Sequence, residues 1–145
     1  MRHFSLALVA LVSISASALA QCSTLTVSGS INAGQTITVD VTGAPANGFV
    51  TLAIGDAGTT NIPFPMNPLV LGVTHFIVLP IGVADASGHA SISVDIPANI
   101  PAGLIHDHTF TAQAISLSLS MPTLGQFPML SWCVSNTATL VSGNG

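Results

Sequence analysis

The sequence predicts an all-β fold, a two-layer antiparallel β-sandwich of seven or eight strands. Apolar and polar residues alternate in several short segments, which is the period of a strand with one buried face. Turn-forming Gly, Pro, Asn and Asp residues separate these segments at short intervals. No segment has the apolar stripe of an amphipathic helix. Together these features are typical of an immunoglobulin-like sandwich, with a closed barrel as the main alternative.

The first three predicted strands follow one another closely. Residues 23–29 and 36–42 each alternate between polar and apolar side chains, as expected for half-buried strands. Residues 49–54 are more continuously apolar, which indicates a more deeply buried strand. The Asn47-Gly48 pair tolerates positive φ and predicts a turn directly before this strand.

The remaining strands are separated by longer connections. Residues 55–72 predict a long loop with extended pieces, because their three prolines each remove a backbone donor. A second loop that carries Pro and Gly is predicted at 121–129. The segments that predict strands in this half are 73–79, 89–96, 108–119 and 132–141, and alternation supports 89–96 and 108–119.

The N-terminal segment has the features of a secretory signal peptide. Met1-Arg2-His3 is a short positive start, an uncharged apolar run follows, and Ala18-Leu19-Ala20 supplies the small-x-small cleavage pattern. We therefore expect residues 1–20 to be removed before Gln21, leaving one domain at 21–145. A buried N-terminal helix is the alternative. A lipoprotein anchor would need Cys22 directly after a small residue, but Gln21 separates it from Ala20. No second run of 18 apolar residues occurs, so no transmembrane segment is expected in the mature chain.

The charge content excludes several classes of protein. Charged residues make up 4% of the chain, with one Arg, five Asp and no Glu or Lys. Removing residues 1–20 removes Arg2, the only basic residue apart from histidines. A chain without cations cannot neutralise phosphates, so a nucleic-acid binder is excluded. Stability must come from apolar burial, backbone hydrogen bonds and covalent linkage.

Cys22 and Cys133 are the only cysteines. In an exported chain, two cysteines most simply form one disulfide, here between the second mature residue and the last predicted strand. Two free buried thiols are the alternative. Zinc bound by cysteine alone is not favoured, because only two thiols are present and no CxxC motif occurs.

Several turn and strand motifs carry a resemblance to a family. The run Val41–Gly55 (VTGAPANGFVTLAIG) is similar to the opening of small secreted β-sandwich modules of planctomycete-type bacteria. Asp85–Pro97 (DASGHASISVDIP), Phe110–Ala114 (FTAQA) and Val134–Asn136 (VSN) resemble a hairpin and two strands of the same modules. The resemblance extends over residues 25–141. It implies a secreted sandwich domain and carries no catalytic residue to this chain, and the family does not explain its histidines.

A metal site is one hypothesis. His106 and His108 lie on the same side of an extended segment, and two imidazoles can bind copper or zinc. Further ligands could come from His75, His89 or a methionine in a predicted loop. The alternative interpretation is that these residues are polar loop positions before a strand.

Catalysis and calcium binding are not favoured. Ser, His and Asp are present, but no Gly-x-Ser-x-Gly elbow and no pair of glutamates occur. The aspartates at 56, 85 and 107 are isolated from one another, whereas a calcium loop needs several close together. We therefore expect a protein that is not an enzyme and carries no cofactor.

Two apolar segments predicted as loops are candidates for contact surfaces. Residues 62–71 and 124–130 both contain Phe-Pro-Met, which places Phe64, Met66, Phe127 and Met129 in loops. Such residues either fold back as a lid on the core, the favoured interpretation, or form an exposed contact patch. Sugar binding is not favoured, because there is no Tyr and the single tryptophan adjoins Cys133.

The sequence therefore predicts an exported, non-catalytic structural or binding module at the cell surface or outside the cell. Its partner would be a protein or a surface, of a kind that the sequence does not identify. The alternative function is a periplasmic copper or zinc carrier that uses His106 and His108.

Overall fold

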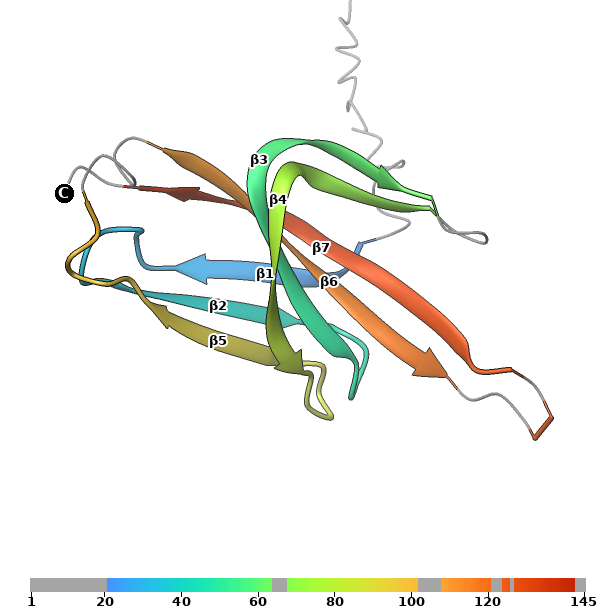
Figure 1. The fold of residues 1–145 in the computed structure, drawn as a ribbon. Helices are drawn as coiled ribbons and strands as arrows, with labels where there is room; N and C mark the ends of the chain where they lie inside the picture. The colour runs from blue at the N-terminus through green and yellow to red at the C-terminus, as the bar shows by residue number, and fades with distance from the viewer. Residues whose placement is uncertain (1–20, 64–67, 102–107, 121–123, 126, 143–145) are drawn as a thin grey trace, which may run out of the picture.

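The computed structural model describes residues 21–63, 68–101, 108–120, 124–125 and 127–142. These residues form seven strands, and no helix occurs among them (Figure 1). The all-β class and the strand number are therefore confirmed. The predicted signal peptide, residues 1–20, lies outside the described residues. The strands are β1 (Gln21–Ser28), β2 (Thr36–Thr42), β3 (Phe49–Ile62), β4 (Leu69–Val83), β5 (Ala90–Asp95), β6 (Thr109–Ser120) and β7 (Met129–Val141).

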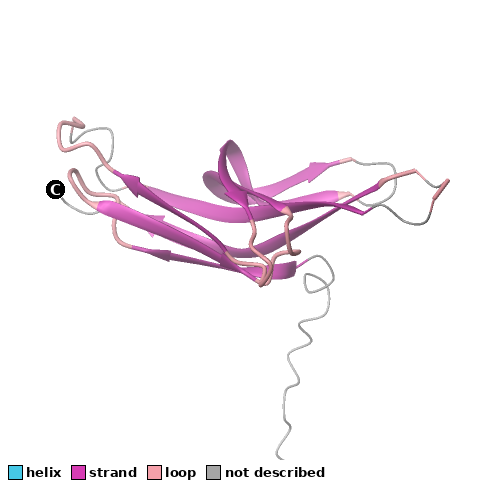
Figure 2. Ribbon diagram, turned by 90° about the horizontal axis from the view of Figure 1, so that it is seen from below, coloured by secondary structure: helices cyan, strands magenta, loops and turns pink. Residues whose placement is uncertain are grey.

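All seven strands join in one sheet, with the order β4-β3-β6-β7-β1-β2-β5. The sheet curls into a half-barrel (Figures 1 and 2). Five neighbouring pairs are antiparallel, but β1 and β7 are parallel, so the predicted wholly antiparallel arrangement is wrong. β1 pairs parallel with β7 along one edge and antiparallel with β2 along the other. The two-layer immunoglobulin-like sandwich is not confirmed, because β1 links both halves into a continuous sheet.

The concave side of the sheet holds the main core. Alternate residues of β2 point inwards, and Ile37, Val39 and Val41 are buried as the alternation predicts. They meet Val50 and Leu52 of β3 together with small residues of β6. Burial of aliphatic side chains from both ends of the sheet against one another favours its curl.

The hairpin of β3 and β4 is much longer than predicted. Residues 55–62 and 69–72 belong to strands, so the predicted long loop at 55–72 is wrong. Pro63 and Pro68 lie just outside the paired residues, where the loss of a donor costs no ladder bond. The glycines mark close approach and not a loop, since a Cβ on Gly55 would lie 2.5 Å from the Thr74 carbonyl oxygen.

The outer half of this hairpin, residues 57–62 and 69–74, bends away from the sheet, and we call it the arm. The β3–β4 register shifts between Ile54 and Asp56 and again between Ala57 and Thr60, and such irregularities bend a hairpin. The bend stands out from the sheet in Figure 2. Leu71 and Val73 of the arm are fully buried against Ile115 and other residues of β6 and β7. The arm therefore covers a second apolar cluster on the outer face of the sheet.

Candidate functional site: an apolar contact surface and its supports

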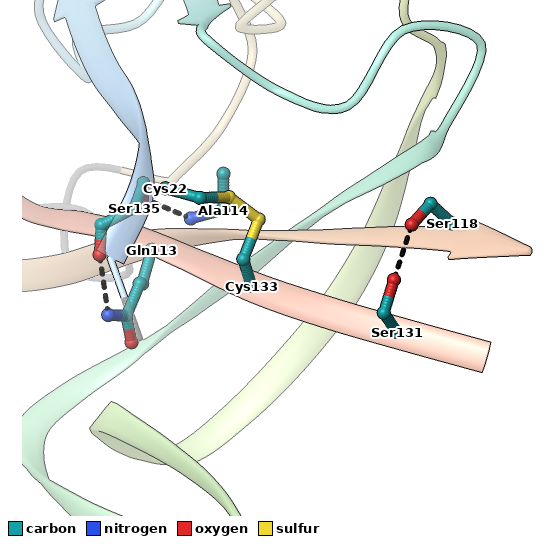
Figure 3. Close-up of a disulfide and its surroundings, with 7 residues drawn as sticks. All are labelled: Cys22, Gln113, Ala114, Ser118, Ser131, Cys133 and Ser135. Carbon is teal, nitrogen blue, oxygen red and sulfur yellow. Dashed lines mark hydrogen bonds between the residues drawn. A yellow bond between two sulfur atoms is a disulfide. The ribbon is translucent and has the colours of Figure 1, made fainter. Parts of the chain in front are cut away.

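The predicted disulfide is present. Cys22 of β1 and Cys133 of β7 are bonded, with their Cα atoms 5.6 Å apart and 111 positions apart in the sequence (Figure 3). The parallel pairing of these strands is short, with only Gln21 opposite Val134 and Ser23 opposite Ser135. The disulfide thus fixes β1 at a point where few backbone bonds hold it.

The Asn136 side chain extends this short ladder. Its Oδ1 accepts a hydrogen bond from the Leu25 N–H at 2.8 Å, and its Nδ2 donates to the Leu25 carbonyl at 3.1 Å. One side-chain amide thereby replaces a backbone partner for a buried residue. Together with the disulfide, Asn136 fastens β1 to β7 where β1 turns to pair with β2.

A second amide fastens the arm. The Gln113 Oε1 accepts a hydrogen bond from the Gly72 N–H at 2.8 Å, and its Nε2 donates to the Ser135 carbonyl at 2.8 Å. The Ser135 Oγ in turn accepts from the Ala114 N–H at 2.8 Å (Figure 3). Gln113 and Ser135 are both buried, so these bonds are shielded from water.

Beyond the arm, the outer face of the sheet stays apolar. The strand register sets Val83, Phe49, Leu117 and Trp132 side by side across β4, β3, β6 and β7. The next pair outwards on the same face is Leu119 opposite Leu130. We call these six residues the apolar end surface.

Exposure increases along this surface with distance from the arm. Leu117 and Trp132 are half-buried and pack against the second cluster. Phe49 is 44% exposed, Leu130 is 54% exposed, and Val83 and Leu119 are each 64% exposed. Figure 1 shows the paired ends of β6 and β7 extending beyond the other strands. The apolar end surface is therefore open to solvent in this chain.

The predicted contact loops divide between the two interpretations. Leu69 and Leu71 belong to the arm and are buried, as a lid requires. Phe127, by contrast, is 90% exposed, Met129 is 59% exposed, and Leu124 is fully exposed at the end of the β6–β7 hairpin. Phe64 and Met66 lie outside the described residues. The described part of the first segment therefore fits the favoured lid interpretation, whereas the described part of the second segment fits the exposed contact patch.

The clearest polar cluster lies between the β4–β5 turn and β2. The His89 Nε2 lies 3.1 Å from Asp40 Oδ1, and its Nδ1 lies 4.0 Å from Asp85 Oδ2. Hydrogen bonds from the Ser91 side chain and from His89 lower the pKa of Asp40. The Ser87 hydroxyl and the His89 backbone N–H lower the pKa of Asp85 in the same way. These contacts hold the β4–β5 turn against β2 as a structural polar patch.

The other histidines do not gather into a site among the described residues. His75 lies at the bend of the hairpin with φ 47° and approaches Asp56 at 3.5 Å, with both side chains well exposed. The His108 backbone N–H donates to the Ser142 hydroxyl at 2.7 Å. His106 and Asp107 lie outside the described residues, so the His106–His108 metal pair stays a prediction. Within the described ranges no three His, Cys, Asp or Glu side chains are placed to hold a metal ion.

Comparisons with known proteins add no relative. No protein-family model, no curated protein and no solved structure matches this chain. In the part of the chain that the structure describes, no helix is long and apolar enough to cross a membrane.

Sequence patterns identified only part of the apolar end surface. Leu130 falls in the apolar loop predicted at 124–130, whereas Phe49 sits in a segment that looks like an ordinary strand and Val83 follows the predicted strand 73–79. They join the surface only through the register of four strands that are distant in sequence. No local pattern reports that register.

Proposed function

We propose that this chain is an exported, non-catalytic structural or binding module that acts at the cell surface or outside the cell. The observation that carries the proposal is the apolar end surface, where large apolar side chains lie exposed on one face without a charged residue among them. Contiguous apolar patches of this kind on a folded protein are typical of contact sites.

Two features support export. Residues 1–20 have the composition of a signal peptide, and the chain has a disulfide between Cys22 and Cys133. Disulfides persist mainly in oxidising compartments, which include the periplasm and the extracellular space. The resemblance to secreted planctomycete-type modules agrees with this location.

A non-catalytic role is supported by the clearest polar cluster. There the Ser87 hydroxyl donates to Asp85 at 2.6 Å, while the His89 ring contacts Asp40. A serine nucleophile needs its hydroxyl on the histidine ring. The three residue types therefore meet in an arrangement that suits turn stabilisation.

We also propose that the curled sheet is a variant of the immunoglobulin-like sandwich. One half would be β1-β2-β5 and the other β4-β3-β6-β7, with the main core between them. The support is that Leu25 and Val39 of one half pack in the same cluster as Leu52 and Ala112 of the other. An experimental structure in which these halves do not face each other would contradict the proposal.

Two measurements test the function. Mass spectrometry of the exported protein should give a chain that begins at Gln21, and a chain still starting at Met1 would contradict export. A fluorescent apolar dye should bind the native protein, and Leu130→Ser should weaken that binding. The matched control is Val94→Ser, which changes an exposed apolar residue of β5 and should leave dye binding unchanged. Equal binding by all three proteins would remove the apolar end surface as the contact site.

A further inference from the structure

We infer that the apolar end surface binds the same surface on a second copy of this chain. The inference rests on the proposed function, because it names the partner of the proposed contact surface. The arm covers only part of the apolar outer face and leaves the apolar end surface open.

The exposed area suits a dimer. Phe49, Val83, Leu119 and Leu130 are about half exposed, and Leu124 and Phe127 at the adjoining hairpin end are almost fully exposed. We take about 200 Å² for a fully exposed large apolar side chain and multiply it by the exposed fraction of each residue. The six residues together then expose an apolar area on the order of 800 Å². The largest patch of an ordinary monomer is about 300–600 Å². A standard protein interface buries about 800 Å² on each partner.

Charge favours a second copy as the occupant. The chain from residue 21 onwards has no Lys or Arg, so two copies cannot attract each other through Lys or Arg ion pairs. The four described aspartates, 40, 56, 85 and 95, all lie outside the apolar end surface. Two copies that meet through this surface keep their carboxylates off the interface, whereas contact through the β2–β5 half would bring like charges together. Self-association through the apolar end surface therefore avoids the charge repulsion that contact through the β2–β5 half would bring.

The shape of the surface permits two-fold symmetry. Leu117 and Trp132 lie at its centre, with Leu119 and Leu130 on one side and Phe49 with Val83 on another. In a two-fold arrangement, Leu119 and Leu130 of one copy would lie against Phe49 and Val83 of the other. Such isologous contacts are the commonest way in which identical chains pair.

Sedimentation velocity over a wide concentration range tests this inference with the exported protein, purified without a tag. We expect a monomer–dimer equilibrium. Leu119→Ser and Leu130→Ser should each weaken it about tenfold or more, because each removes a buried leucine from the interface. Phe127→Ser provides a second variant, since this residue is 90% exposed and its replacement leaves the fold intact. Val94→Ser, on the other half of the sheet, should leave the equilibrium unchanged.

Three outcomes would overturn the inference. The first is a wild-type protein that stays monomeric at every concentration. The second is a dimer that none of Leu119→Ser, Leu130→Ser and Phe127→Ser weakens. The third is a monomer that sediments with phosphatidylcholine vesicles, which would assign the surface to lipid. In the first case, dye binding that depends on Leu130 would still support the proposed contact surface, so the two proposals fail separately.

Discussion

Replacing Gln113 should release the arm from the sheet. Its amide connects the Gly72 N–H and the Ser135 carbonyl, and both groups lie where the regular ladders are interrupted. Gly72 falls in the register shift between β3 and β4, and Ser135 falls in the shift between β6 and β7. Gln113 therefore bridges two backbone groups at the points where the β3–β4 and β6–β7 registers shift.

The expected loss of stability follows from these two hydrogen bonds. Gln113→Met keeps the length and most of the packing of the side chain but can make neither bond. A neutral hydrogen bond stabilises by about 1 kcal/mol, and a buried partner left unpaired costs about 1–3 kcal/mol. We expect the free energy of unfolding to fall by about 2–4 kcal/mol, out of a total of about 5–15 kcal/mol for a domain of this kind.

The single tryptophan is a convenient probe for this experiment. Trp132 packs against the cluster beneath the arm, so opening of the arm should shift its fluorescence to longer wavelength. Urea unfolding gives the free energy, and hydrogen exchange at Gly72 reports the arm itself. The control is Ser131→Ala, which removes an exposed bond of 2.6 Å to Ser118 and should change stability by less than about 0.5 kcal/mol. A Gln113→Met protein as stable as Ser131→Ala would refute the reasoning.

Three further predictions concern the rest of the sheet. Replacing Cys22 and Cys133 together by Ser should lower the free energy of urea unfolding by about 2–5 kcal/mol, because a long loop is no longer closed, and an unchanged midpoint would contradict this. Asn136→Ala should cost about 1–3 kcal/mol and speed hydrogen exchange of the Leu25 amide, whereas unaltered exchange there would show that β1 needs no such support. The pKa values of Asp40 and Asp85 are lowered in the folded state. The free energy of unfolding should therefore be constant well above the unfolded pKa of about 3.9 and should fall as the pH drops through the lower folded pKa values.

Substitutions of the two aspartates test the source of this loss of stability at low pH. Asp40→Asn and Asp85→Asn remove the titrating groups, so each variant should flatten the fall in unfolding free energy between about pH 5 and pH 2. Asp95→Asn is the comparison, because this residue lies on the same half of the sheet and accepts a bond from Thr36. A fall that is equally steep in wild type, Asp40→Asn and Asp85→Asn would assign the acid sensitivity to other groups.

Simple alternation predicted the strands that have one buried face. In β2 the side chains of Ile37, Val39 and Val41 are buried, and the residues between them are more exposed. The predicted range 36–42 matches the strand. The pairing of Cys22 with Cys133 followed from counting, because two cysteines allow only one intrachain bond. The alternating strands depend on residues close in sequence, and the disulfide joins the only two cysteines of the chain.

The arm could not be predicted in this way. Gly55, Gly58 and three prolines are ordinary loop signals, and a sequence does not distinguish a glycine in a flexible loop from one that admits a neighbouring backbone. Pro63 and Pro68 flank the paired residues of the hairpin, and the glycines lie where β3 bends. Both signals were correct for local conformation and misleading for pairing.

The apolar end surface shows the same limit for function. Buried residues run without a break from Thr111 to Ser116 of β6, because the main core covers one face and the arm covers the other. Further along β6 the arm no longer covers the outer face, and Leu117 and Leu119 continue the same side of the strand into solvent. An alternating Leu-Ser-Leu-Ser run therefore looks identical whether its apolar face is covered or open. The reach of the arm decides which it is, so the exposure of the apolar end surface depends on the hairpin of β3 and β4 as much as on the strands that display it.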